Sequence, residues 1–366
     1  MKEFDDIFID DTREGTKIPK ENYLDDGLYP IIDQGKELIA GYSNDAEGIY
    51  NDIPAILFGD HTRIVKYYDR PFFLGADGVK ILKIKDTSKY FPKYYYYALS
   101  EARIPDTGYN RHFKWLKALY FKNPTIAEQR NIADIFDKII SLVQLHYLQI
   151  ADLDMLVKSR FIELFGDPVS NTKSIPVTEI AKKFFVTKLA GFEYTKYIKY
   201  QDSGDVIMVR GLNVKDKKLK LDDVYYIDSE VSDKLPRSQL KENDIVMTYV
   251  GVNIGDVALV DAKNKYHLAP NVAKISPYDI NETNPVFFVY LLAFNKENFA
   301  GNATNTAKQA LNMEKIRKLQ IILPKIELQN QFADFVAQVD KSKLAVQQSL
   351  NELETLKKSL MQQYFG

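Results

Sequence analysis

Two stretches of the chain carry the same helical pattern of apolar residues, 200 residues apart. Between Ile132 and Leu164, apolar side chains recur in alternating steps of four and three, and the same rhythm runs from Phe332 to Tyr364. An average step of 3.5 over this length is typical of a coiled-coil seam rather than of a single surface helix. The residues predicted to form the seam are Phe136, Ile139, Val143, Ile150, Leu153, Val339, Val346, Leu350, Leu353 and Leu360.

Both stretches have helix signals at each end. Each begins at a proline, Pro124 or Pro324, and each ends at a Phe-Gly pair, at Gly166 or Gly366. Proline suits the first turn of a helix, and glycine can take the left-handed conformation that ends one. We therefore predict two long paired helices. Antiparallel pairing is favoured because it places two similar halves at opposite ends, related by a pseudo-twofold axis. The alternative is two separate amphipathic helices, each packed on its own domain.

The remaining segments indicate two α/β domains. They are rich in Tyr, Ile, Val and Phe, with frequent Gly, Asn-Asp and Pro punctuation, which is typical of short strands. Residues 74–81 and 268–275 resemble each other, which adds a fainter repeat. The predicted strands are 55–58, 64–68, 80–84, 206–209, 245–249 and 257–260, and helical stretches are predicted at 90–99 and 285–294. The predicted fold class is α+β, with α/β domains at 1–123 and 167–323 separated by two long antiparallel helices, 124–166 and 324–366, that form a coiled coil with a pseudo-twofold internal repeat.

Length and composition are those of a two-domain protein from a reducing compartment. A chain of 366 residues is too long for one small core. The absence of cysteine excludes disulfides, thiolate metal sites and cysteine nucleophiles. The acidic N-terminal residues contain no apolar core like that of a signal peptide, and no run approaches the ~20 apolar residues of a membrane span. We expect a cytoplasmic protein that makes no contact with a membrane.

The formal net charge of −1 weakens the case for a nucleic-acid partner without excluding it. Binding to a polyanion requires a basic face rather than a basic whole. Residues 167–323 carry a small excess of Lys and Arg, whereas residues 1–123 carry a small excess of Asp and Glu. Near-neutrality therefore suggests weak DNA binding by this chain alone, with help from partner subunits.

Motifs for catalysis and for metal binding are missing from the sequence. There is no glycine-rich phosphate loop of either usual type. A methyltransferase of exocyclic amines would need an Asn/Asp-Pro-Pro-Tyr/Phe motif, which the segments 123–125 and 167–169 do not complete. No two of the four histidines have metal-ligand spacing, and His146 lies on the predicted seam. We predict no catalytic residue and no metal site.

Three polar segments are candidates for DNA contact, because their side chains can donate hydrogen bonds to base edges or phosphates. One is the turn after a predicted strand that holds His61 and Arg63. The second is a loop near the end of the first domain, and the third is its counterpart in the second domain. A solvated loop without function is the alternative for each. The predicted residues of these two loops are Tyr109, Asn110, Arg111, His112 and Lys114, and then Asn302, Thr304, Asn305 and Lys308.

The second domain offers a further set of candidates in which charged and aromatic side chains alternate. One group follows residue 187, and two others come directly after predicted strands. Residues 215–220 form a candidate basic hairpin. A charge run is often only a solvated surface, and that alternative stays open here. The predicted contact residues are Lys188, Tyr194, Lys196, Arg210, Asn213, Tyr249 and Asn253.

Several of these segments resemble the specificity (S) subunit of type I restriction–modification systems. The resemblance lies in Leu-Phe-Gly-Asp-Pro at 164–168 and Tyr-Phe-Gly at 364–366, which close the two helices. It extends to Phe-Gly-Asp-His-Thr-Arg at 58–63 with Leu-Gly-Ala-Asp-Gly-Val at 74–79, and to the helix starts at 124–130 and 324–331. The whole chain is similar to this family.

The resemblance implies a function without chemistry on this chain. In such systems each recognition domain reads a few base pairs of double-stranded DNA, so the target is bipartite, and the helices act as a ruler and dock two modification subunits. Those partners bind S-adenosylmethionine and methylate adenine, while separate restriction subunits use ATP and Mg to translocate and cleave. No cofactor is expected on this chain.

Two other functions fit the sequence less well. One is a coiled-coil scaffold whose domains bind proteins, which the near-zero net charge mildly favours. The other is an enzyme with an unrecognised carboxylate site at Asp5, Asp6, Asp10 and Asp11, although an acidic solvated terminus is the simpler interpretation.

Overall fold

The chain folds into two compact units. The structure, a computed structural model, describes residues 1–75, 78–108, 110–301 and 311–366. Unit 1 consists of Met1–Gln149 and Ala345–Gly366, and unit 2 consists of Ile150–Leu344. Each unit therefore contains one globular domain together with one end of each long helix.

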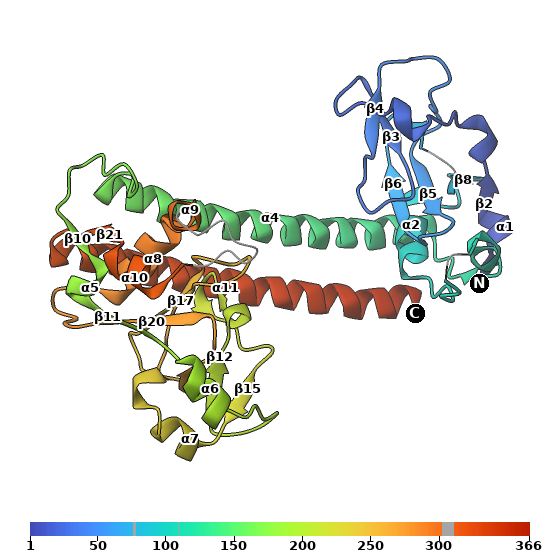
Figure 1. Ribbon diagram of the computed structural model, residues 1–366. Coiled ribbons are helices and arrows are strands. Elements are labelled where there is room, and N and C mark those ends of the chain that lie inside the picture. The colour runs from blue at the N-terminus through green and yellow to red at the C-terminus, as the bar shows by residue number, and fades with distance from the viewer. Residues whose placement is uncertain (76–77, 109, 302–310) are drawn as a thin grey trace. The chain divides into compact units, whose positions relative to one another are not determined.

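The two predicted long helices are present (Figure 1). Helix α4 is Ile126–Phe165 and helix α11 is Ile326–Phe365, each of 40 residues. The glycine that follows α4, Gly166, has a φ of 73°, which is the left-handed conformation expected of a residue that ends a helix. No helix within the described parts of the chain combines the length and apolar character needed to cross a membrane.

Contacts inside each unit give the direction of helix pairing. In unit 1, Phe136 near the start of α4 packs on Phe365 at the end of α11, with ring centroids 5.7 Å apart. In unit 2, Phe161 near the end of α4 packs on Phe332 near the start of α11, at 5.4 Å. The helices therefore pair antiparallel in both units. The prediction of a coiled coil is confirmed, and the alternative of two unpaired helices is wrong.

The predicted seam residues all lie on the inner side of this pairing. Phe136, Ile139, Val339 and Leu350 are buried. The other six are half-buried, as expected where two helices cover each other and water reaches the margins: Val143, Ile150, Leu153, Val346, Leu353 and Leu360.

The domain of unit 1 is built from short strands and short α-helices. Its strands are β1 (Lys2–Glu3), β2 (Phe8–Asp10), β3 (Tyr29–Ile32), β4 (Gly41–Ser43), β5 (Ala55–Gly59), β6 (Val65–Tyr68), β7 (Phe73–Leu74), β8 (Val79–Ile84) and β9 (Tyr120–Phe121), and its helices are α1 (Phe4–Ile7), α2 (Pro92–Glu101) and α3 (Phe113–Leu116).

The domain of unit 2 is larger and follows the same plan. Its strands are β10 (Val177–Glu179), β11 (Phe184–Lys188), β12 (Val206–Val209), β13 (Val214–Lys215), β14 (Lys217–Leu219), β15 (Tyr225–Ile227), β16 (Gln239–Leu240), β17 (Ile245–Thr248), β18 (Val257–Leu259), β19 (Lys265–Leu268), β20 (Val272–Pro277) and β21 (Gln320–Ile322). Its helices are α5 (Ile180–Lys183), α6 (Gly191–Tyr197), α7 (Ser229–Asp233), α8 (Pro285–Phe294), α9 (Lys296–Gly301) and α10 (Met313–Lys318).

The two domains share their sheet connectivity, which extends the sequence repeat to the fold. The main sheets have the orders β2-β8-β5-β6 and β11-β20-β17-β18-β14-β13, and the second sheets have the orders β4-β3-β7 and β15-β12-β19-β16. Each second sheet contains one parallel pair, β3 with β7 or β12 with β19. A two-stranded antiparallel ribbon, β1 with β9 or β10 with β21, joins the start of each domain to the strand before a long helix.

The predicted strands and short helices are confirmed within one or two residues at their ends. The strand predicted at 206–209 and the helix predicted at 285–294 have the predicted bounds. Helix α8 is apolar almost all round and is buried, which accounts for its clear signal. The basic segment 215–220 forms the predicted hairpin between β13 and β14.

A buried glutamine ties each domain to the first turn of a long helix. In unit 1, Gln129 accepts a hydrogen bond from the N–H of Phe91, the N-cap of α2, at 2.7 Å, and its amide donates to the carbonyl of Pro124 at 2.9 Å. In unit 2, Gln329 accepts from the N–H of Asn284, the N-cap of α8, at 2.9 Å and donates to the carbonyl of Pro324 at 2.8 Å. Because both amides are fully buried and fully bonded, each connection is specific.

We expect Gln329→Leu to lower the free energy of unfolding by about 2 kcal/mol or more, because the buried N–H of Asn284 and the helix-start carbonyl would lose their partner. The measurement is urea unfolding followed by circular dichroism. The control is Gln331→Leu, since Gln331 is exposed on the same turn and should change stability by less than about 0.5 kcal/mol. Equal effects of the two substitutions would contradict a role for the buried amide.

Candidate nucleic-acid interface

In both units, two loops meet at the same edge of the fold. Strand β5 ends opposite the start of β8, with Gly59 paired to Val79, and strand β17 ends opposite the start of β20, with Thr248 paired to Val272. In unit 1 the loop after β5 meets the loop after β3, and in unit 2 the loop after β17 meets the loop after β12. Loops at strand ends are held by a rigid scaffold but are free to vary in sequence. This edge is the candidate interface in each unit.

In unit 1 the two loops are joined by hydrogen bonds to Gln34. The backbone N–H of His61 donates to the side-chain oxygen of Gln34 at 3.2 Å, and the Thr62 hydroxyl donates to the backbone carbonyl of Gln34 at 2.7 Å. Gly78 has a φ of 103°, and the Gln34 amide lies where a β-carbon of residue 78 would be. A residue with a side chain at position 78 would have a strained backbone and would displace Gln34, which explains why glycine occupies this position.

Arg63 holds a neighbouring loop. Its guanidinium donates to Asp106 at 2.8 Å and to the carbonyl of Ile104 at 3.4 Å. The backbone N–H of Gly108, and next the Arg63 guanidinium, lower the pKa of the Asp106 carboxyl. Arg63 is half-buried, and the Asp106 side of this ion pair is exposed.

The structure contradicts a direct DNA contact by His112. Its ring is fully buried. Its Nδ1 lies 3.0 Å from the carbonyl of Asp60, and its backbone N–H donates to the same carbonyl at 2.8 Å. The Asp60 carboxylate accepts from the N–H of Phe113 at 2.7 Å. His112 therefore positions the turn that holds His61.

In unit 2 the corresponding loops enclose a hollow of about 400 Å³, called here the Arg210 hollow. The loop after β12 supplies one wall, the loop after β17 supplies another, and α6 contributes a tyrosine. The structure thus brings together three residues predicted to contact DNA, Tyr194, Arg210 and Asn253. The complete lining is Tyr194, Tyr200, Arg210, Gly211, Leu212, Thr248, Val250, Gly251, Val252, Asn253, Pro270 and Asn271.

Arg210 is fixed at the rim of this hollow by stacking and by an ion pair. Its guanidinium lies 4.5 Å from the ring centroid of Tyr225 and donates to the Asp223 carboxylate at 2.8 Å. Tyr225 in turn stacks on Tyr200, with ring centroids 5.1 Å apart. Burial, and next the neighbouring Tyr194, raise the pKa of Tyr200. The hollow therefore offers aromatic rings beside a cation that is already paired.

Two polar atoms of this hollow lack a hydrogen-bond partner among the described residues. They are the hydroxyl of Thr248, which is 2% exposed, and Nε of Arg210.

Asn213 is the second predicted contact that the structure contradicts. It is fully buried. Its amide donates to the carbonyls of Lys220 and Asp223, both at 2.8 Å, and its oxygen accepts from the N–H of Arg210 at 3.0 Å. Asn213 therefore holds the shape of the loop that carries Arg210, and its own side chain is not exposed to solvent.

The other predicted contact residues fall into two groups. Lys188, Lys196, Asn110, Arg111 and Lys114 are exposed and remain candidates, and Lys188 lies 5.5 Å from the ring centroid of the predicted Tyr249. Tyr109, Asn302, Thr304, Asn305 and Lys308 lie outside the described residues.

Sequence reasoning missed Gln34, Thr62, Thr248 and Val252, which belong to these loops. Thr62, Thr248 and Val252 lie in or beside segments that the sequence did indicate, whereas no sequence signal marked Gln34. Only the meeting of two loops distant along the chain distinguishes these residues. The basic hairpin also makes a contact that the sequence did not indicate. Its Lys218 donates to Asp340 of α11 at 2.8 Å within unit 2.

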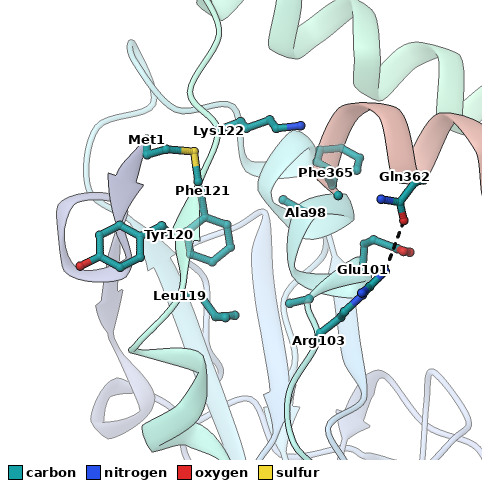
Figure 2. A pocket seen from close by; sticks show the side chains of 12 residues that line it. Met1, Ala98, Glu101, Arg103, Leu119, Tyr120, Phe121, Lys122, Gln362 and Phe365 are labelled. Atoms are coloured by element: carbon teal, nitrogen blue, oxygen red, sulfur yellow. Dashed lines mark hydrogen bonds between the residues drawn. The ribbon is translucent and has the colours of Figure 1, made fainter.

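A second hollow, of about 370 Å³, surrounds the last turn of α11 in unit 1 (Figure 2). Arg103 donates to the side chain of Gln362 at 3.4 Å across it, and Phe121 and Phe365 supply apolar walls. None of the predicted DNA-contact residues lines it. This hollow lies where α11 packs on the domain of unit 1, and not at the edge where the two loops meet.

A family model described as the type I restriction modification DNA specificity domain matches residues 1–153 and 180–355. The match covers most of the chain and occurs once in each half of the repeat. The chain therefore belongs to this family.

Known relatives agree with this assignment. The specificity subunit of the type I restriction enzyme EcoBI from Escherichia coli is 26% identical over 171 residues, covering 43% of this chain and 34% of that protein. Another Escherichia coli type I specificity subunit is 28% identical over 137 residues, covering 34% of each. The chain thus matches about a third of the length of these relatives. The S subunit from M. genitalium has a similar fold, with a TM-score of 0.64 at 16% identity over 100% of this chain and 95% of that one.

A buried histidine lies in the sheet that carries the Arg210 loop. His267, on β19 beside β12, is fully buried, and its Nδ1 lies 3.0 Å from the carbonyl of Leu268. Burial lowers its pKa below the ordinary value of 6.5. The folded state therefore holds this ring neutral at pH values at which the unfolded chain would protonate it.

We expect the free energy of unfolding to fall as the pH is lowered from 7.5 to 5.5. Above pH 6.5 His267 is mostly neutral in both states, whereas below it the unfolded state binds more protons than the folded state, at a cost of up to about 1.4 kcal/mol per pH unit. Urea unfolding at several pH values measures this. His267→Leu should flatten the dependence, and His61→Gln serves as the control. An unchanged slope in His267→Leu would exclude this histidine as the cause.

Proposed function

We propose that this chain is the non-catalytic DNA-recognition subunit of a type I restriction–modification complex that reads a bipartite target. The domain of each unit reads one half-site. The observation that carries the proposal is the repeated edge at which two loops meet, formed by polar residues around Gln34 in unit 1 and by the Arg210 hollow in unit 2. Membership of the specificity family supports double-stranded DNA as the ligand.

The side chains at these edges suit base recognition. An amide such as that of Asn253 can donate to and accept from base edges in a major groove. The exposed lysines, including Lys188 and Lys196, suit phosphates, which position a protein on DNA without reading its sequence. Because the two edges carry different residues, each half-site would have its own sequence.

The long helices would separate the two readers and dock the modification subunits. Leu156 and Leu356 occupy equivalent positions of the repeat and are 48% and 46% exposed. Leu148, Met155 and Leu344 are each more than 60% exposed. Exposed apolar side chains along paired helices favour protein docking, and the repeat favours two equivalent partners.

The chemistry of the complex would lie on those partners. Modification subunits would bind S-adenosylmethionine, and restriction subunits would bind ATP and Mg. This chain would contribute no catalytic group and would act in the cytoplasm, where it meets DNA.

The proposal is tested by expressing the chain with its modification subunits in a host without other adenine methylation. We expect long-read sequencing to detect methylated adenine in a bipartite motif, and none when this chain is omitted. Thr62→Ala should relax one half-site only, because Thr62 belongs to unit 1 alone. Robust methylation by the purified chain alone with S-adenosylmethionine, or a motif without two parts, would refute the proposal.

DNA affinity of the assembled complex should fall steeply with salt. Each neutralised phosphate contributes roughly −0.9 to the slope of log affinity against log salt, so four contacts would lower affinity about 100-fold between 50 and 200 mM. Fluorescence anisotropy with a labelled duplex measures this. A salt-independent affinity would instead favour a scaffold whose domains bind proteins.

A further inference from the structure

One apolar side chain at the rim of the Arg210 hollow lies outside the hydrophobic core. Val252 is 99% exposed, at the tip of the loop that follows β17. Leu212, on the opposite loop, also lines the hollow and is 43% exposed. Single exposed apolar residues are common, but here two of them, from different loops, line the same hollow.

The Val252 loop is held by backbone hydrogen bonds on both sides of its tip. The N–H of Gly255 donates to the carbonyl of Thr248 at 2.9 Å, and the N–H of Asp256 donates to the carbonyl of Asn253 at 3.0 Å. The N–H of Tyr249 donates to the carbonyl of Asn271 at 3.0 Å, which anchors the loop to the start of β20. Gly251 has a φ of 104° and open space around it, so it makes the turn that presents Val252. The tip is therefore presented by an ordered loop.

Adjacent residues at this tip have complementary chemistry. A branched aliphatic side chain can contact the 5-methyl group of thymine, and an asparagine amide can bind N6 and N7 of adenine. Both groups of an adenine–thymine pair are displayed in the major groove. Val252 and Asn253 are consecutive, so one base pair, or two neighbouring pairs, can meet both side chains.

We propose that Val252 contacts the methyl group of a thymine in the half-site read by unit 2, with Asn253 on the adenine of the same or the next pair. This inference rests on the proposed function and adds the identity of the base to it. The equivalent turn of unit 1 carries His61, Thr62 and Arg63 instead. The contact of Val252 with a thymine methyl group would thus belong to unit 2.

The test uses the full-length chain assembled with its modification subunits. The complex first selects its target from a library of random-sequence duplexes. Each thymine of the selected target is then replaced, one at a time, by deoxyuridine, which lacks only the 5-methyl group. Affinities are measured for the wild-type chain, for Val252→Ala, and for Val169→Ala as the control, because Val169 is also exposed but does not line the hollow.

At one thymine, we expect deoxyuridine to weaken binding about fourfold in the wild-type complex and in the Val169→Ala control, as for the loss of one buried methyl group. Val252→Ala should lose about the same affinity on the normal target and show no further loss with deoxyuridine there. Asn253→Ala should weaken binding about tenfold and relax the preference for adenine at the same or the next pair.

Two results would overturn the inference while leaving the proposed function intact. One is a selected target at which every deoxyuridine has the same effect in the wild-type and Val252→Ala complexes. The other is a Val252→Ala complex that binds DNA normally but loses its modification subunits, which would make Val252 a protein contact. A selection that yields no bipartite motif would overturn the proposed function itself.

Discussion

The rest of the structure depends on a buried glutamine that fastens each domain to the first turn of a long helix. The side chains of Gln129 and Gln329 accept hydrogen bonds from the N-cap N–H groups of α2 and α8, respectively. Their amides donate to the carbonyls of Pro124 and Pro324, just before the long helices. A buried amide can be satisfied in one arrangement only, so it fixes orientation where apolar packing alone would allow sliding. The aromatic contacts of Phe136 with Phe365 and of Phe161 with Phe332 then add the non-directional part of the stabilisation.

Repetition of this connection explains how two domains of unequal size can share one plan. The ribbons β1–β9 and β10–β21, the parallel pairs and the strand ends at Gly59 and Thr248 recur in the same order. The core and the helix connection are held by burial, whereas the loops beyond the strand ends are not. Loops on a rigid scaffold can change their chemistry without affecting the fold, which is the property that a protein reading two different half-sites needs.

The two arginines beside the loop edges, Arg63 and Arg210, are already paired within the chain. Arg63 is paired with Asp106, and Arg210 with Asp223, and in both pairs the carboxylate is mostly exposed. Exposed ion pairs contribute little stability, so a phosphate could replace the carboxylate at small cost. The same pairing agrees with the net charge of −1. Under the proposed function, selectivity would then rest on neutral groups such as amides, hydroxyls and Val252. Tight binding would then need the larger surface of an assembled complex.

The sequence by itself determined the elements that depend on local pattern. The two long helices, their seam, the main strands and the repeat could be read from residue spacing, because helix and strand periodicities are properties of neighbouring residues. Only the tertiary structure decided which polar residues face solvent. His112 and Asn213 look like Asn110 and Asn253 in the sequence, but the first two are buried by partners 52 and 10 residues away, at Asp60 and Asp223. Exposure of a polar side chain depends on what the rest of the chain brings against it, and no local pattern encodes that.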